Sequence, residues 1–72
     1  MNGYLFLLSS VTSAMKGEEI LRKNGYSAFV FRDTDFNTYG CGYVIKAFGE
    51  KEKMAGILKK SGIRVNEIRE SR

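Results

Sequence analysis

Two stretches of this chain repeat one local pattern. Residues 19–26 read Glu-Ile-Leu-Arg-Lys-Asn-Gly-Tyr, and residues 56–63 read Gly-Ile-Leu-Lys-Lys-Ser-Gly-Ile. Each stretch combines the end of a predicted helix, a basic pair, a glycine suited to the left-handed position after a helix, and the entry to an apolar strand. The repeat favours two similar strand–helix–strand units in tandem, although the same signals are also typical of helix ends in general.

Apolar periodicity predicts six elements. Strands are expected at residues 4–8, 26–32, 41–48 and 63–68, and helices from Ser10, as N-cap, to about Asn24 and at residues 50–61. Residues 70–72 are expected to fray. Two tandem strand–helix–strand units give the order β-α-β-β-α-β. The predicted fold is therefore α+β, a ferredoxin-like sandwich with a four-stranded antiparallel sheet and both helices on one face.

The first predicted helix carries two small residues on its apolar stripe. Ala14 and Gly17 would let this helix lie close to the sheet. Glu18 and Arg22 form an i,i+4 pair, which contributes a few tenths of a kcal/mol to an isolated helix. We therefore expect the pair to be a minor feature of the helix surface.

The second predicted strand alternates, with Ala28 and Val30 on one face and Phe29 and Phe31 on the other. If both helices cover one face of the sheet, one of these two pairs must lie on the open face. Phenylalanines on an open face mark a surface for association. This pattern predicts a homodimer or a docked partner on the open face.

Length and composition limit the classes of protein. The chain has 72 residues, which allows one domain over residues 1–72 with a small core. It has no His and one Cys, so it cannot form an internal zinc cage or an intrachain disulfide, and no metal or cofactor is predicted. A lone cysteine favours a reducing compartment, and we expect a cytoplasmic protein. The apolar run at residues 4–8 is too short to span a membrane. The net charge of +4 fits a solvated surface or a nucleic-acid footprint.

The lone cysteine lies in a loop of turn-forming residues that leads into the third predicted strand. Gly40 and Gly42 flank Cys41, and their freedom favours an exposed turn whose N–H groups can stabilise an anion. Arg32 and Lys46 are candidates for lowering the pKa of the thiol. The absence of His as a base argues against papain-like hydrolysis, and one interpretation is a thiolate that accepts a sulfur or selenium atom and hands it on. The competing interpretation is a small buried hydrophobe at a strand end.

The chain also resembles the selenium/sulfur carrier-like family of small bacterial proteins over nearly its whole length. The resemblance rests on Ser10 and Ala14 after the first strand, residues 18–25, Cys41-Gly42 opening a strand, and residues 57–60. It implies that Cys41 is the carrier site, with Gly42 beside it, and that the partners are sulfur or selenium donor and acceptor proteins. The family tends to have prolines in the loop before the cysteine, and this chain has none.

An RNA-recognition motif is the alternative with the same topology, because it stacks bases on aromatic residues of its first and third strands. Residues 5–7 and 40–44 resemble the two signatures of that motif, with Phe6 and Tyr43 as the stacking rings. Cys41 and Lys46 stand where the motif has two further rings. Each stacked base would contribute about 1–3 kcal/mol, so this interpretation depends on two rings only.

Overall fold

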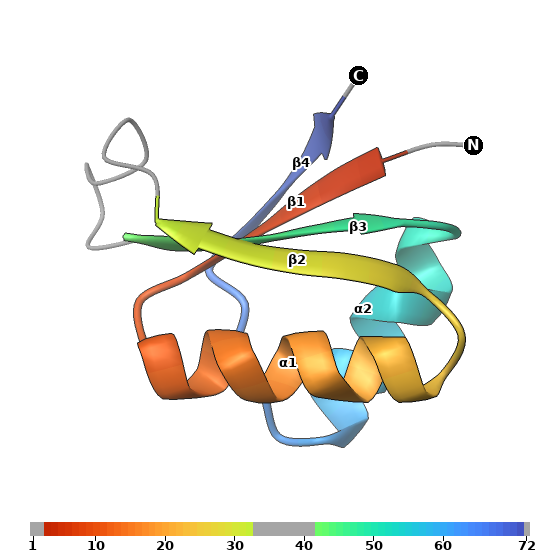
Figure 1. Ribbon diagram of the computed structural model, residues 1–72, viewed down its shortest axis with the longest axis horizontal. Coiled ribbons are helices and arrows are strands. Elements are labelled where there is room, and N and C mark those ends of the chain that lie inside the picture. The colour runs from red at the N-terminus through yellow and green to blue at the C-terminus, as the bar shows by residue number, and fades with distance from the viewer. Residues whose placement is uncertain (1–2, 33–41, 72) are drawn as a thin grey trace.

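The computed structural model describes residues 3–32 and 42–71, which form four strands and two helices (Figure 1). In chain order these are β1 (Gly3–Leu8), α1 (Val11–Lys23), β2 (Ser27–Arg32), β3 (Tyr43–Phe48), α2 (Lys51–Lys60) and β4 (Glu67–Ser71). The order β-α-β-β-α-β confirms the predicted arrangement.

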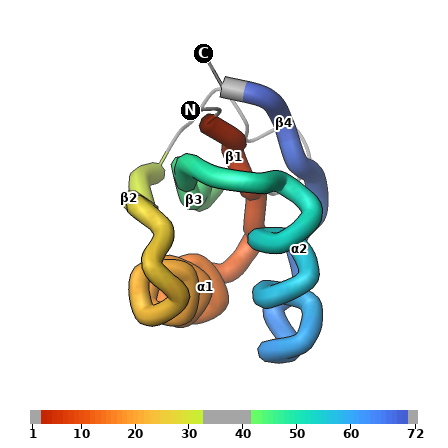
Figure 2. The backbone as a smooth tube through the Cα atoms, turned by 90° about the vertical axis from the view of Figure 1, so that its right-hand side faces the viewer, coloured from red at the N-terminus to blue at the C-terminus, as the bar shows by residue number. Residues whose placement is uncertain are grey.

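Within the described residues the strands form one sheet with the order β2-β3-β1-β4, and every neighbouring pair is antiparallel. β1 and β2 therefore run parallel to each other with β3 between them, and α1 connects them. α2 likewise connects β3 to β4 across β1. Both helices lie on the same side of the sheet (Figures 1 and 2). This is the α+β ferredoxin-like fold that the sequence predicts.

The main core fills the space between the sheet and the two helices. Its largest fully buried side chains come from the inner face of the strands and from both helices, and burial of each stabilises the fold by about 1.5–3 kcal/mol. They are Phe6, Leu8, Leu21, Ile45, Met54 and Leu58. Ala28 and Ala47 lie at the same inner face, where their small side chains leave room for the helices.

Gly17 is a point of close contact between α1 and the core. A Cβ atom at this position would lie 2.7 Å from Cδ1 of Ile45 and 3.1 Å from Cδ2 of Leu58. Ala14, one turn earlier, is fully buried. The prediction that small residues let this helix lie against the sheet is confirmed.

The repeated sequence pattern proves to be a repeated helix cap. After α1, the Tyr26 N–H donates to the Leu21 carbonyl at 3.0 Å, and Gly25 has a φ of +88°. After α2, the Ile63 N–H donates to the Leu58 carbonyl at 2.9 Å, and Gly62 has a φ of +78°. Both ends are Schellman motifs, in which the residue after the glycine bonds back to the last turn. At the other end of α1, the Ser13 N–H donates to Oγ of Ser10 at 3.4 Å, as predicted for the N-cap.

The prediction for the last strand is wrong. A strand was expected at residues 63–68 with a frayed end after it, whereas β4 runs from Glu67 to Ser71. Ile63 is instead buried in the core beside the end of α2. The chain must then return from the helix layer to the sheet, and the Asn66 N–H donates to the Leu7 carbonyl at 2.8 Å just before β4 begins. The alternation of Ile63, Val65 and the polar residues between them is typical of a strand, so the local pattern does not reveal this change of layer.

Candidate functional site

The candidate site lies at the end of the sheet where β2 stops and β3 begins. Arg32 closes β2 and Tyr43 opens β3, and the two residues are cross-strand partners. Tyr43 is also the partner of Leu8, which is followed by the N-cap of α1. The chain between these two adjacent strand ends is residues 33–41. Cys41 and Gly40 lie outside the described residues, and Cys41 directly precedes the half-buried Gly42 in the chain.

Arg32 places a positive charge at this end of the sheet. Its side chain is exposed, and its guanidinium carbon lies 5.9 Å from the centre of the Tyr43 ring. Such a cation–π contact contributes about 0.5–1 kcal/mol at an exposed site. The contact holds the guanidinium beside the first residue of β3, two positions after Cys41.

Lys46, the other predicted electrostatic helper, lies elsewhere. Its ammonium nitrogen is 5.6 Å from the centre of the Phe48 ring. Phe48 is the last residue of β3, at the opposite end of the strand from Gly42. The structure therefore does not bring Arg32 and Lys46 together, and Lys46 points along the open face away from the candidate site.

Gly42 lies in open surroundings. A Cβ atom at this position would meet no heavy atom of the described residues within 4 Å. The described neighbours therefore do not demand a glycine here, and its predicted part in shaping the loop depends on residues outside the described ranges.

The two rings expected to stack on RNA lie on the wrong face of the sheet. Phe6 is 0% exposed and belongs to the core beneath the helices, and Tyr43 packs against the same core. Both side chains lie on the helix-covered face of the sheet. Phe6 pairs with Ile45 and Tyr43 pairs with Leu8, and these partners belong to the main core. Base stacking on Phe6 would require opening the core. The prediction that Phe6 and Tyr43 form a base-stacking surface is therefore wrong.

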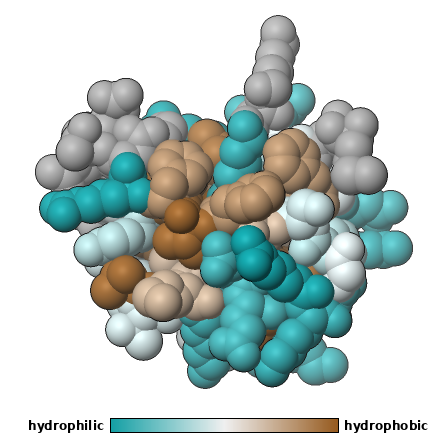
Figure 3. All heavy atoms as spheres, viewed as in Figure 1, coloured by the Kyte–Doolittle hydropathy of each residue, from teal (hydrophilic) through white to brown (hydrophobic). Residues whose placement is uncertain are grey.

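The open face of the sheet instead carries the phenylalanines of β2. Phe29 is 51% exposed and Phe31 is 37% exposed, which confirms the alternation predicted for this strand. Lys46 and Phe48 of β3 lie on the same face, beside a small cluster of Leu5, Leu7 and Val44. Figure 3 shows brown and tan side chains gathered over β2 and the neighbouring part of the sheet. This face is apolar over β2 and the centre of the sheet, and it carries the charged residues Lys46 of β3 and Glu67 and Arg69 of β4.

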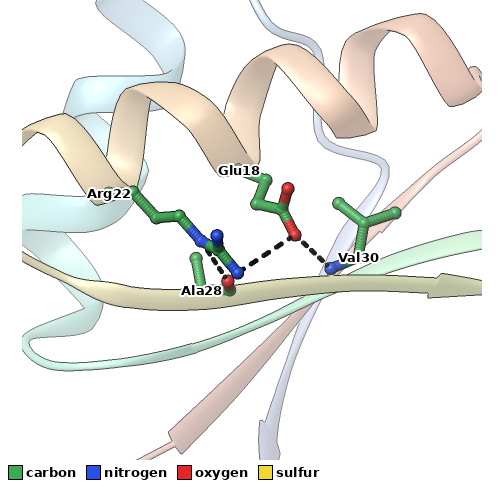
Figure 4. A network of polar contacts seen from close by, with 4 residues as sticks. All are labelled: Glu18, Arg22, Ala28 and Val30. Atoms are coloured by element: carbon green, nitrogen blue, oxygen red, sulfur yellow. Dashed lines mark hydrogen bonds and ion pairs between the residues drawn. The ribbon is translucent and has the colours of Figure 1, made fainter.

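A polar network that sequence spacing did not reveal joins α1 to β2 (Figure 4). One Glu18 oxygen, Oε2, accepts from the Val30 N–H at 2.9 Å and lies 3.8 Å from Nη2 of Arg22. Arg22 Nε donates to the Ala28 carbonyl at 2.9 Å. The i,i+4 spacing predicted the ion pair alone. Its contacts with β2 could be foreseen only once the topology places α1 along that strand.

Among the described residues, no three His, Cys, Asp or Glu side chains are grouped as metal ligands would be. None of the helices at residues 11–23 and 51–60 is long and apolar enough to cross a membrane.

Residues 3–70 match the family model described as "Putative Se/S carrier protein-like". The match covers both strand–helix–strand units and includes Cys41 and its flanking glycines. No curated protein and no solved structure matches the chain.

Proposed function

The chain belongs to the Se/S carrier-like family, and we propose that it carries a sulfur or selenium atom on Cys41 and passes it between protein partners. The observation that carries this proposal is the family match over residues 3–70, which spans nearly the whole domain. The position of Arg32 supports it, because this exposed cation lies beside Tyr43, two residues after Cys41 in the chain.

The proposed transfer conserves atoms and electrons. The Cys41 thiolate attacks the terminal sulfur of a donor protein's persulfide, the donor's S–S bond breaks, and the donor thiolate leaves. Cys41 then holds the atom as a persulfide, or as a selenosulfide when the donor supplies selenium. An acceptor nucleophile attacks that terminal atom and releases the Cys41 thiolate. The Cys41 thiolate attacks in the first step and leaves in the second, so a cation that stabilises this thiolate would favour both steps.

Arg32 is the side chain that we assign to this electrostatic role. It is exposed, so solvent screens its charge and its effect on the thiol is modest. Lys46 is excluded from the role because its ammonium lies over Phe48. A free thiol of this kind functions in a reducing compartment, so we propose that the carrier works in the cytosol.

The first test is the pH dependence of Cys41 alkylation by iodoacetamide in the folded protein. Cys41 is the only cysteine, so all modification reports on this residue. We expect fast reaction with an apparent pKa below the free-thiol value of about 8.5. Arg32→Ala should raise that apparent pKa, whereas Lys46→Ala, which removes an equal charge elsewhere, should leave it unchanged.

The second part of the test detects the cargo. After incubation with a persulfide donor, intact mass should increase by one sulfur atom, and Cys41→Ser should abolish the increase. If Cys41 is alkylated only after denaturant is added, the residue is part of the core and the carrier proposal is wrong.

We propose the open face as the surface on which a donor or acceptor protein docks. Phe29 and Phe31 supply exposed apolar area, and Lys46 supplies a charge that favours an acidic rim on the partner. A second copy of the chain on this face is the alternative occupant. Phe31→Ser should weaken transfer from the donor while leaving Cys41 alkylation unchanged, and sedimentation of the wild type over a range of concentrations tests the homodimer.

A further inference from the structure

The outer edge of β2 is a place where backbone groups face away from the sheet. β2 ends the strand order on one side, so only β3 pairs with it. In an antiparallel ladder, alternate residues direct their N–H and C=O groups away from the neighbouring strand. Ala28 and Val30 are these residues, because side chains from α1 reach their backbone groups from outside the sheet. The edge would otherwise be a template for another strand.

Glu18 and Arg22 occupy two of the four outward backbone groups of Ala28 and Val30 that a new strand would use. Glu18 accepts from the Val30 N–H and Arg22 donates to the Ala28 carbonyl, each at 2.9 Å. The carboxylate and the guanidinium lie 3.8 Å apart, and the guanidinium carbon lies 5.7 Å from the centre of the Phe29 ring. We call Glu18 and Arg22 the edge clamp. Figure 4 shows both side chains extending from α1 to the same stretch of β2.

Exposed apolar side chains flank this edge on both sides. The exposed large hydrophobic residues of the described ranges are Phe29 and Phe31 of β2, and Val11 and Met15 of α1. In Figure 3 the brown and tan surface extends from β2 onto part of α1. β2 has no charged residue before Arg32 and no proline, which are the features that commonly block edge pairing. The edge clamp takes their place.

We infer that the outer edge of β2 is a pairing surface for a second copy of this chain, and that the edge clamp holds it closed. The argument for a second copy is self-complementarity. A two-fold axis at Phe29 sets the Val30 N–H of one copy opposite the Ala28 carbonyl of the other, and the reverse pair forms by symmetry. These are the same two groups that Glu18 and Arg22 occupy. The two Phe29 rings become cross-strand neighbours, a favourable aromatic pair.

The test compares two double variants, each of which removes one negative and one positive side chain from α1. Glu18→Ala with Arg22→Ala opens the edge, whereas Glu19→Ala with Lys23→Ala removes the adjacent i,i+4 pair, whose side chains are mostly exposed. Sedimentation velocity should show self-association at least about tenfold tighter for the clamp variant than for the wild type, because pairing no longer competes with two hydrogen bonds in each copy. The control variant should sediment like the wild type.

Two further measurements place the contact at β2. Adding Phe29→Lys to the clamp variant sets like charges opposite each other across the axis and should restore the wild-type association state. The Val30 amide should be protected from hydrogen exchange in the associated clamp variant. Glu18→Ala and Arg22→Ala each remove one of the two hydrogen bonds, so each alone should give self-association between that of the wild type and that of the double variant. If the double variant fails to fold, these single variants test the inference. A folded clamp variant that sediments like the wild type, with a rapidly exchanging Val30 amide, would overturn the inference.

Discussion

Gly17 shows how one missing methyl group sets the distance between α1 and the sheet. The hypothetical Cβ atom is 2.7 Å from Ile45 and 3.1 Å from Leu58, and both of these side chains are 0% exposed. Neither side chain can move into solvent to make room. Replacing glycine by alanine in a helix normally stabilises it by up to about 1 kcal/mol, but inserting a methyl group into a filled core costs about 1–3 kcal/mol. The packing cost exceeds the helix propensity gained.

We therefore expect Gly17→Ala to lower the free energy of unfolding by about 1 kcal/mol, measured by urea denaturation. Gly56→Ala is the matched control, because Gly56 is an exposed helical glycine with nothing within 4 Å of its hypothetical Cβ. The control should raise the free energy of unfolding by up to about 1 kcal/mol. Equal effects at the two positions would contradict this account of the contact.

The helices of this domain end in the same way, and the shared cap directs the chain back toward the sheet. In each cap the residue after the glycine bonds to the last turn and places an apolar side chain, Tyr26 or Ile63, against the core. The left-handed glycine makes this reversal within one residue. After α1 the chain enters β2 at once, whereas after α2 it runs through Arg64 and Val65 before β4 begins. An identical cap is thus followed by two different paths.

Gly62→Ala should lower the free energy of unfolding by about 1–2 kcal/mol, because alanine at a φ of +78° crowds its Cβ against the following carbonyl. Thermal melting monitored by circular dichroism would measure the loss. Ser61→Ala, one residue earlier at an ordinary φ of −86°, should change stability by less than about 0.5 kcal/mol. A melting temperature for Gly62→Ala equal to that of Ser61→Ala would argue against the cap.

In the molecule as a whole, the two faces of the sheet differ in how far they are buried. One face is covered by both helices and holds most of the core, including Phe6 and Ile45. The other face leaves Phe29 and Phe31 partly exposed, at 51% and 37%. Residues 33–41, which include Cys41, join the adjacent ends of β2 and β3, so the sequence of the proposed carrier site interrupts neither face of the described sheet.

Phe6→Ala should cost about 3–5 kcal/mol, since it removes a fully buried ring. A domain of this size has little stability to lose, so we expect Phe6→Ala to be largely unfolded by circular dichroism at room temperature. Phe29→Ala should remain folded with a nearly unchanged melting temperature. A folded Phe6→Ala variant that specifically loses RNA binding would restore the RNA-recognition interpretation.

Local signals account for most of what could be predicted. Ser10, Gly25 and Gly62 mark helix ends through bonds to residues within one turn, and the alternation of residues 26–32 separates Val30 from Phe31 without reference to any other strand. The family match agrees with the resemblance carried by Cys41-Gly42 and the two helix ends. These features depend on short separations along the chain, where the amino-acid sequence itself specifies the partner.

Contacts between distant segments could not be read in the same way. The Glu18–Arg22 pair has the spacing of a surface ion pair, and only the packing of α1 along β2 makes it a clamp on Val30 and Ala28. In sequence, Phe6 resembles a base-stacking ring. Its pairing with Ile45 of β3 shows that its side chain lies on the helix-covered face. The start of β4 depends on the path from Ile63 back to the sheet. Chain order and caps follow from local chemistry, whereas the exposed edge, the buried ring and the separation of Arg32 from Lys46 follow from which face each strand turns to the core.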